Sequence, residues 1–190
     1  MSLILAVVSA AHAHVHTYQA DLTGANEAVP NSSPAIGVST VTLDLDLITI
    51  LIELDFSDLT GSSTAAFVHG PTSIPLIGFA GPMTPALVET GFPMGVVAGG
   101  YSHLFDLTDA PGYDPAFITE GGGTVSDALN VLISAFEGGK AYLSIQSVGF
   151  PGGEFRGFYT EVREVPEPTS IAMMGLGFCA LAIVRRRKNV

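Results

Sequence analysis

Cysteine, tryptophan and basic residues are scarce in this sequence. Its one cysteine, Cys179, lies in an apolar segment near the C-terminus, and tryptophan is absent. The rest of the chain can therefore form no disulfide and must be stabilised by burial of its own side chains. With 7 basic against 18 acidic residues the net charge is −11, and the one dense basic run is at the C-terminus. Because this charge repels phosphate, nucleic acid is excluded as a partner.

Charged residues of either sign are also few. They make up 13% of the 190 residues, whereas hydrophobic residues make up 47%, so the composition excludes an intrinsically disordered chain. The length suits one ordinary domain with terminal segments. Between His14 and Glu164 there are 17 acidic and 3 basic residues, a net charge of −14. This charge predicts a soluble surface that favours cations over polyanions.

Residues 1–13 are typical of the end of a secretory signal peptide. An apolar run over residues 3–8 is followed by Ala11 and Ala13, the spacing that a signal peptidase reads. The run is short and no basic residue precedes it, so either translation begins further upstream or export is inefficient. The alternative is a first strand that is buried in the domain.

The C-terminal residues 165–190 combine three features. The motif Val165-Pro166-Glu167-Pro168 is followed by an apolar segment, residues 171–184, and then by the cations Arg185, Arg186 and Arg187. A helix over residues 169–184 would be about 24 Å long, a marginal membrane span. We therefore expect a C-terminal transmembrane-like helix with its cations on the cytoplasmic side, which places the upstream chain outside the inner membrane.

This tail resembles the PEP-CTERM sorting signal of Gram-negative bacteria, which consists of the same motif, a short hydrophobic helix and an arginine cluster. The resemblance implies an inner membrane-anchored precursor, recognition by an exosortase-type processing enzyme and cleavage near Pro166 to Pro168. The upstream domain would then pass to the cell envelope or to an extracellular exopolysaccharide matrix. An ordinary single-pass anchor is the alternative, and both interpretations export the domain.

The central segment, residues 14–164, alternates apolar and polar residues with a period of two, which is typical of half-buried strands. Val41 and Leu43 fall on one face of such a strand, and Thr40 and Thr42 on the other. The predicted strands are residues 18–22, 40–46, 48–56, 64–68, 96–107, 140–148 and 154–162. Because Gly and Pro turns separate them, we predict an all-β fold, an antiparallel β-sandwich.

One segment has the period of a helix instead. Apolar residues recur at helical spacing from Val125 to Phe136, and Thr124 or Ser126 can cap the first turn. A pair of glycines after the segment can end it. We therefore predict one short amphipathic helix that packs on the sheet.

Three motifs and their order resemble the CHRD domain, a module named from chordin. Residues 18–30 (YQADLTGANEAVP) are similar to its first strand and the segment that follows. Residues 66–71 (AFVHGP) are similar to its histidine motif, and residues 151–157 (PGGEFRG) to its last motif. The resemblance spans residues 17–160 and implies extracellular protein binding with no established enzymatic reaction.

The sequence departs from this family at two histidines. Phe67 and Gln146 stand where the family has histidine, and of the three only His69 is retained. If the family histidines bind metal or act in catalysis, this chain keeps too few of them for a tight site.

His69, Glu154 and Arg156 are the candidate ligand-binding residues. His69 precedes a Gly-Pro turn, whereas Glu154 and Arg156 follow a glycine-rich turn at alternate positions. One interpretation is a polar rim that binds a ligand. The alternative is a structural role, in which Glu154 and Arg156 pair with neighbours to fix a turn and His69 hydrogen-bonds a loop carbonyl.

Four carboxylates and two histidines are candidate metal ligands. Asp44, Asp46, Glu53 and Asp55 crowd two adjacent strands, where Ca²⁺ would relieve their repulsion. A solvated acidic face is the alternative, because no calcium-loop motif accompanies them.

His14 and His16 follow the predicted signal cleavage site. Cleavage after Ala11 or Ala13 leaves one of these histidines at the third position of the mature chain. Its imidazole, the free amine and backbone nitrogens could then hold Cu²⁺ or Ni²⁺ in a square plane.

The sequence contains no nucleophile elbow, zinc-protease motif or phosphate loop. The leading hypothesis is therefore an exported, non-catalytic envelope or extracellular-matrix module without a required cofactor, which binds exopolysaccharide, protein or itself. The alternative is a metal-binding or metal-dependent enzyme domain that uses His69 with the N-terminal histidines His14 and His16.

Overall fold

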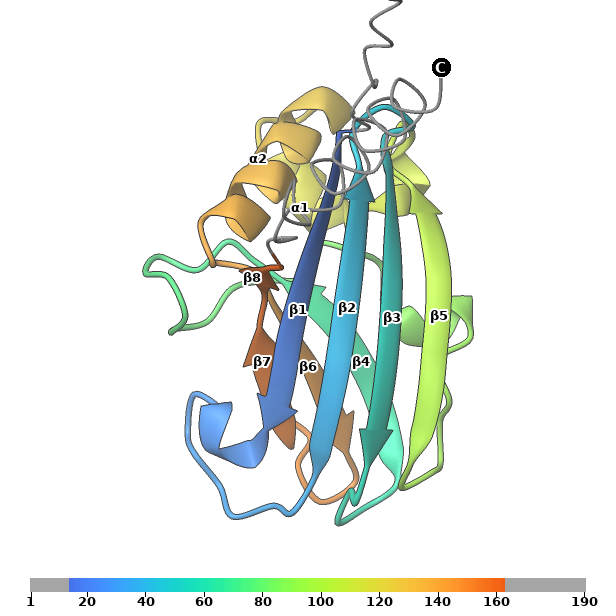
Figure 1. The fold of residues 1–190 in the computed structure, drawn as a ribbon, viewed down its shortest axis with the longest axis vertical. Coiled ribbons are helices and arrows are strands. Elements are labelled where there is room, and N and C mark those ends of the chain that lie inside the picture. Colours follow the sequence, from blue (N-terminus) through green and yellow to red (C-terminus); the bar gives the residue numbers. More distant parts are fainter. Residues whose placement is uncertain (1–13, 163–190) are drawn as a thin grey trace, which may run out of the picture.

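The computed structural model describes residues 14–162, which form one antiparallel sheet with a few helices (Figure 1). The strands are β1 (Val15–Thr23), β2 (Ile36–Asp44), β3 (Thr49–Ser57), β4 (Ser63–His69), β5 (Gly99–Asp106), β6 (Tyr142–Ser147), β7 (Phe155–Phe158) and β8 (Thr160–Glu161). The helices are α1 (Pro115–Glu120) and α2 (Val125–Glu137), with short 3₁₀ turns η1 (Gly24–Asn26), η2 (Leu87–Thr90) and η3 (Ala110–Gly112). The hydrogen-bonded strand order is β4-β6-β7-β1-β2-β3-β5, and β8 pairs with β1.

The sheet curls over so that its two halves form two layers. In Figure 1, β1, β2, β3 and β5 lie in front, and β7, β6 and β4 lie behind them. The predicted all-β antiparallel fold is confirmed. The expected two-sheet sandwich is corrected in one respect, because across residues 14–162 both layers belong to one hydrogen-bonded sheet.

β1 forms the corner between the two layers. It pairs along its whole length with β2 but only at Thr23 with β7. A Cβ atom on Gly157 would lie 2.6 Å from the carbonyl oxygen of Asp21, so the close approach of β7 to β1 requires glycine at this position.

The period-two prediction is confirmed on β2 and β3. Val41 and Leu43 on β2 are buried, as are Ile50 and Ile52 on β3, and the residues between them face outward. β6 differs, because five of its six residues are buried and its two faces are both covered. One face of β6 lies against the core, and loops cover the other.

The predicted helix is confirmed as α2, which packs on the core through Ala128, Leu132 and Phe136. The Phe136 ring contacts the rings of Tyr18 and Tyr159, each at a centroid distance of 5.2 Å. α1 was not expected, because six residues are too few to show a helical period.

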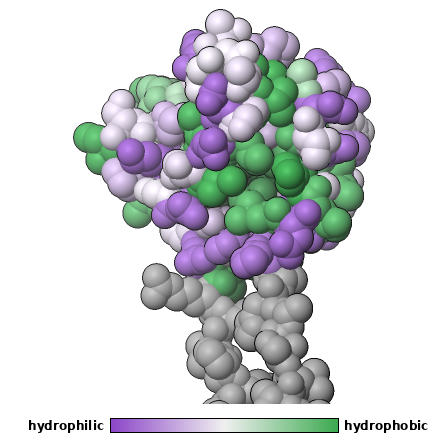
Figure 2. All heavy atoms as spheres, turned by 90° about the horizontal axis from the view of Figure 1, so that it is seen from above, coloured by the Kyte–Doolittle hydropathy of each residue, from purple (hydrophilic) through white to green (hydrophobic). Residues whose placement is uncertain are grey.

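Seen from above, hydrophobic residues gather in the middle of one end of the molecule, and hydrophilic residues border them (Figure 2).

Between residues 14 and 162, no helix combines the length and the hydropathy that a membrane crossing requires. The predicted signal peptide, residues 1–13, and the predicted transmembrane-like helix within residues 165–190 lie outside the described residues.

Candidate functional site

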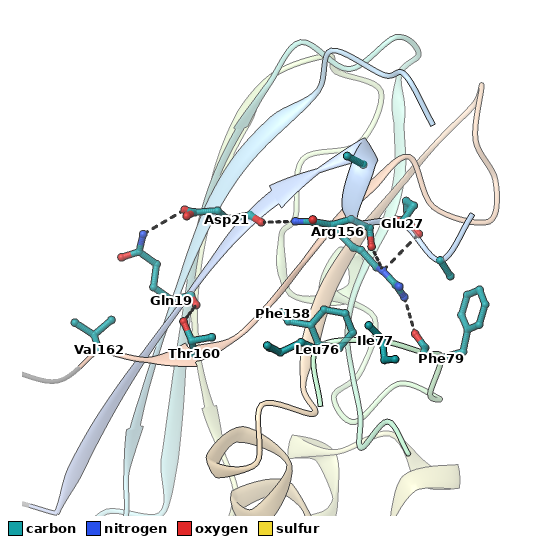
Figure 3. Close-up of a pocket in the computed structure, with 14 residues that line it drawn as sticks. Gln19, Asp21, Glu27, Leu76, Ile77, Phe79, Arg156, Phe158, Thr160 and Val162 are labelled. Atoms are coloured by element: carbon teal, nitrogen blue, oxygen red, sulfur yellow. Dashed lines mark hydrogen bonds and ion pairs between the residues drawn. The ribbon is translucent and has the colours of Figure 1, made fainter. Parts of the chain in front are cut away.

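A groove runs along the outer side of β1 and β7, where loops approach the sheet (Figure 3). Its volume is about 780 Å³. Gln19, Asp21 and Thr160 line one side, residues 76–79 line the other, and Arg156 lies between them. The strands supply the first side because odd-numbered residues of β1 point away from the core.

The second side belongs to an exposed apolar loop, residues 73–79, which follows β4. All seven residues are exposed, and the ring of Phe79 is 69% exposed. The backbone of this loop is nevertheless fixed. The amide of Leu76 donates to the carbonyl of Gly139 over 2.8 Å, and Ile74 forms a β-bridge with Ile77. The loop therefore presents apolar side chains to solvent on a defined backbone.

Arg156 connects this loop to the segment after β1. Its Nε donates to the carbonyl oxygen of Asn26 over 2.6 Å, and its Nη1 donates to that of Gly78 over 2.7 Å. The side chain is almost fully buried, and Glu27 Oε2 lies 3.9 Å from Nε. The guanidinium thus joins two loops to β7, although these loops are about 50 residues apart in sequence.

Three aromatic rings surround the Arg156 guanidinium. Its central carbon lies 4.9 Å from the ring centroid of Tyr142, 5.2 Å from that of Phe158 and 5.6 Å from that of Phe79. Cation–π contacts of this kind are stronger when they are shielded from water. They hold the cation in one position at the base of the groove.

Glu27 is the buried carboxylate of this cluster. Burial raises the pKa of Glu27 above its ordinary value, while the Arg156 charge and hydrogen bonds from the Ala28 backbone and the Ser144 hydroxyl act in the opposite direction. The Ser144 hydroxyl donates to Glu27 Oε1 over 3.3 Å. Glu27 therefore serves to balance the charge of Arg156 inside the fold.

His69 lies at the end of β4 and holds the base of the same apolar loop. Its Nδ1 is 3.1 Å from the carbonyl oxygen of Ala80, and its ring stacks on that of Tyr142 with centroids 4.8 Å apart. Burial lowers the pKa of His69, although hydrogen bonds to the Ala80 and Gly81 backbone oppose this shift. A neutral imidazole that donates from Nδ1 to the carbonyl accounts for this geometry.

Glu154 is buried at a different junction. Its Oε1 accepts hydrogen bonds from the Thr60 amide, the Thr60 hydroxyl and the Ser33 hydroxyl, at 2.7, 2.8 and 2.6 Å. Oε2 has no partner with hydrogen-bond geometry among the described residues, and neither does the neighbouring Ser147 hydroxyl. Burial acts to raise the pKa of Glu154, but the proximity of the Ser147 hydroxyl and the hydrogen bonds from Ser33 and Thr60 outweigh it, so the pKa lies below its ordinary value.

The structure therefore places the three candidate ligand-binding residues at loop junctions. Of His69, Glu154 and Arg156, only Arg156 lines the groove. The other two hold the loops that border it.

The four acidic candidate metal ligands do not converge. Asp44 Oδ1 accepts hydrogen bonds from the amides of Asp46 and Leu47 and so closes the turn between β2 and β3. Asp44 lies opposite Thr49, four residues before Glu53 on β3, a separation of about 13 Å along the strand. Asp55 is further still.

His14 and His16, the two histidines at the start of the described residues, each lie beside a different carboxylate. His14 Nδ1 lies 3.1 Å from Asp46 Oδ1, and His16 Nδ1 lies 3.3 Å from Glu161 Oε1. No group of three or more histidine, cysteine, aspartate or glutamate residues within residues 14–162 is placed to hold a metal ion. The proposed copper site also depends on residues 1–13, which lie outside the described part of the chain.

A second hollow adjoins the groove on the other side of Phe79. It has a volume of about 480 Å³, shares Glu27 and Phe79 with the groove, and is otherwise lined by Val29, Phe150 and the turns around them. The two hollows together form an elongated, two-part depression in the surface.

The sequence alone does not identify Gln19, Asp21, Asn26 or Phe79 as residues that line the groove. The available signal for Phe79 was the apolar run at residues 74–79, which interrupts a loop between two Gly-Pro pairs. The polar residues carry no such signal, because an outward-facing position on a strand looks the same whether or not a loop covers it.

Comparison with known proteins gives two matches to family models. The model described as CHRD domain matches residues 18–159. The model described as PEP-CTERM protein-sorting motif matches residues 164–188. No curated protein and no solved structure matches the chain.

Replacement of Glu154 by Gln tests its role at the loop junction. We expect the free energy of unfolding of the full chain to fall by about 2–4 kcal/mol at neutral pH, because buried donors lose a charged acceptor. The folded pKa lies below the ordinary value of 4.5, so the wild-type advantage is present above that value and is lost as the pH falls through the folded pKa. Urea unfolding at a series of pH values measures the difference.

The matched control for this prediction is Glu53→Gln, because Glu53 is exposed on β3. It should unfold with the wild type at neutral pH. A difference between wild type and Glu154→Gln that stays constant throughout the acid range would contradict the assigned role.

Replacement of Arg156 by Lys tests the cation at the base of the groove. Lysine keeps the charge but cannot donate to both carbonyls and stack on the rings at once. We expect a loss of about 2–4 kcal/mol in the free energy of unfolding and faster proteolysis within residues 73–79. The control is Lys140→Arg at a partly exposed position, which should change neither the free energy of unfolding nor the rate of proteolysis. An Arg156→Lys variant as stable as wild type would contradict the role of Arg156 in holding the two loops.

Proposed function

The chain belongs to the CHRD-domain family, and we propose that it is an exported, non-catalytic module of the cell envelope or extracellular matrix that binds exopolysaccharide through its groove. The PEP-CTERM motif is the recognition signal for exosortase-type processing and marks a protein that is exported and processed at the membrane of a Gram-negative bacterium. The envelope or matrix destination and the polysaccharide ligand are the parts that we propose.

We divide the precursor into a signal peptide (residues 1–13), a binding domain (residues 14–164) and a sorting segment (residues 165–190). In the precursor, residues 171–184 lie in the inner membrane, and Arg185, Arg186 and Arg187 stay on its cytoplasmic side. Processing near Pro166 to Pro168 then separates the domain from this segment.

The observation that carries the binding proposal is the groove, with one polar and one apolar side. Ligand sites are usually preformed hollows with apolar walls and a few fixed polar groups. Here Arg156 fixes two loops that line the groove, through Asn26 and Gly78, while Asp21 and Phe79 remain exposed on either side. A sugar ring, which has apolar faces and a hydroxyl rim, is complementary to this arrangement.

The sorting step is tested by replacement of Arg185, Arg186 and Arg187 with glutamine in the producing bacterium. We expect the wild-type protein from the envelope to end near Pro166 to Pro168, and the variant to keep its complete C-terminus, because the cations orient the segment for processing. Mass spectrometry of the intact proteins measures both ends. Arg163→Gln, just upstream of the motif, is the control and should be processed as wild type is. A wild-type protein that keeps its last residue would overturn the proposal.

Binding is tested by retention of the full chain on immobilised exopolysaccharide from the producing bacterium. The wild type should be retained, and Thr160→Tyr should not, because a large side chain at this exposed position fills the groove. Thr42→Tyr, on the outer face of β2 away from the groove, is the matched control and should be retained. No retention of the wild type, with or without Ca²⁺, would reject polysaccharide as the ligand.

A further inference from the structure

We propose that the groove selects uncharged polysaccharide and rejects acidic polysaccharide, an inference that rests on the proposed function. It follows from the placement of Asp21 and Glu27 beside an arginine that is almost fully buried and already donates hydrogen bonds to two backbone carbonyls. The sign of charge in the groove therefore decides which polymer can enter.

Arg156 is the only cationic side chain among the described residues that line the groove. Proteins recognise carboxylate and sulfate groups chiefly through arginine donors that face the ligand. Here Nε and Nη1 donate to the carbonyls of Asn26 and Gly78, Glu27 lies beside them, and the side chain is only 4% exposed. A uronic acid could reach this cation only if both loops released it.

The charges that a ligand does meet are negative. Asp21 is exposed, and its Oδ1 accepts a hydrogen bond from Gln19 Nε2 over 3.3 Å. Beyond the groove, residues 14–164 carry 17 acidic and 3 basic side chains, so the field of the domain repels polyanions at a distance. An uncharged polymer is repelled neither by the Asp21 carboxylate nor by the negative field of the domain.

The polar side of the groove suits sugar hydroxyls. Gln19, Asp21 and Thr160 are exposed there and offer carboxylate, amide and hydroxyl groups within one short stretch of β1 and β8. A carboxylate accepts and an amide both accepts and donates, so neighbouring hydroxyls of a sugar can be paired at once. The Gln19–Asp21 hydrogen bond orients these groups before a ligand arrives.

The apolar side suits the faces of sugar rings. Leu76, Ile77 and Phe79 are 51%, 54% and 69% exposed on a loop whose backbone is hydrogen-bonded. Phe79 also borders the second hollow. One ring thus separates two hollows, an arrangement that suits consecutive sugars of a chain better than a single monosaccharide.

The test uses exopolysaccharide of the producing bacterium, treated with protease and separated by anion exchange into a neutral and an acidic fraction. Affinity electrophoresis of the full chain in each fraction measures binding. We expect the neutral fraction to retard the protein equally at low and high salt, because ionic screening leaves uncharged contacts unaffected. The acidic fraction should leave its mobility unchanged.

Two variants test the sides of the groove. Phe79→Ala should weaken binding to the neutral fraction about tenfold, the loss expected for one stacked ring. Asp21→Asn should weaken it about threefold, because a charged acceptor is replaced by a neutral one. Leu104→Ala and Glu53→Gln are the matched controls: both residues are exposed on the outer face, outside the groove. A cooperative unfolding transition that begins well above the assay temperature in all four variants confirms that the fold is retained.

The other outcomes separate this inference from the proposed function. Binding to the acidic fraction alone would overturn the inference and leave the proposed function standing. Binding to the neutral fraction that neither Phe79→Ala nor Asp21→Asn weakens would overturn the inference and also the assignment of that binding to the groove. Retention on untreated polymer that disappears after protease treatment would assign the groove to a protein partner and overturn both. Absence of retention on every fraction would also overturn both.

Discussion

The groove depends on one buried cation in a strongly acidic domain. The Arg156 guanidinium donates hydrogen bonds to two carbonyl oxygens, lies beside one carboxylate and contacts three aromatic rings. A buried charge is costly unless it is paired and hydrogen-bonded, and removal of one partner costs more than the pair contributes. The contacts of Arg156 are therefore interdependent: the two loops at Asn26 and Gly78 keep their positions because each accepts a hydrogen bond from the same guanidinium. Tyr142, on β6, links this cluster to His69, since its ring stacks on the imidazole and lies against the guanidinium.

The strands were predictable where one face is buried and the other is solvated. On β2 and β3 this asymmetry leaves a period of two in the sequence, and α2 leaves a period near 3.6 for the same reason. β6 also shows a period of two in the sequence, but that pattern did not predict that loops would cover its second face. The joining of both layers into one sheet was not predictable, since it depends on the contact of β1 with β7 and β8, more than 130 residues away in sequence. The glycine that permits this contact, Gly157, looks like any other glycine in a strand.

The residues of the candidate site were likewise predictable from the sequence only in part. The motif around residues 151–157 identified Glu154 and Arg156 as a pair, and both are indeed buried polar residues. Their alternate spacing suggested one polar rim or one fixed turn, yet each serves a different junction: Glu154 holds Thr60 and Ser33, whereas Arg156 holds Asn26 and Gly78. Spacing along a strand fixes the side of the sheet on which a residue lies, but the loop that covers that side comes from elsewhere in the chain. For this reason the sequence identified the residues that organise the groove and not those that face its interior.

The exposed apolar loop and the acidic surface are best understood together. Residues 73–79 present four large hydrophobic side chains to solvent, a feature that ordinarily favours self-association. No disulfide can hold this loop, because the one cysteine lies in the tail, so Arg156, His69 and the Leu76 amide fix it instead. The acidic residues of the domain oppose contact between two copies, since like charge repels over about 10 Å at moderate salt. That repulsion acts on a second copy and on a polyanion alike, but it leaves an uncharged chain free to approach the loop. Charge and apolar exposure thus act together, because the acidic surface limits self-association through the same loop that the proposed uncharged ligand would contact.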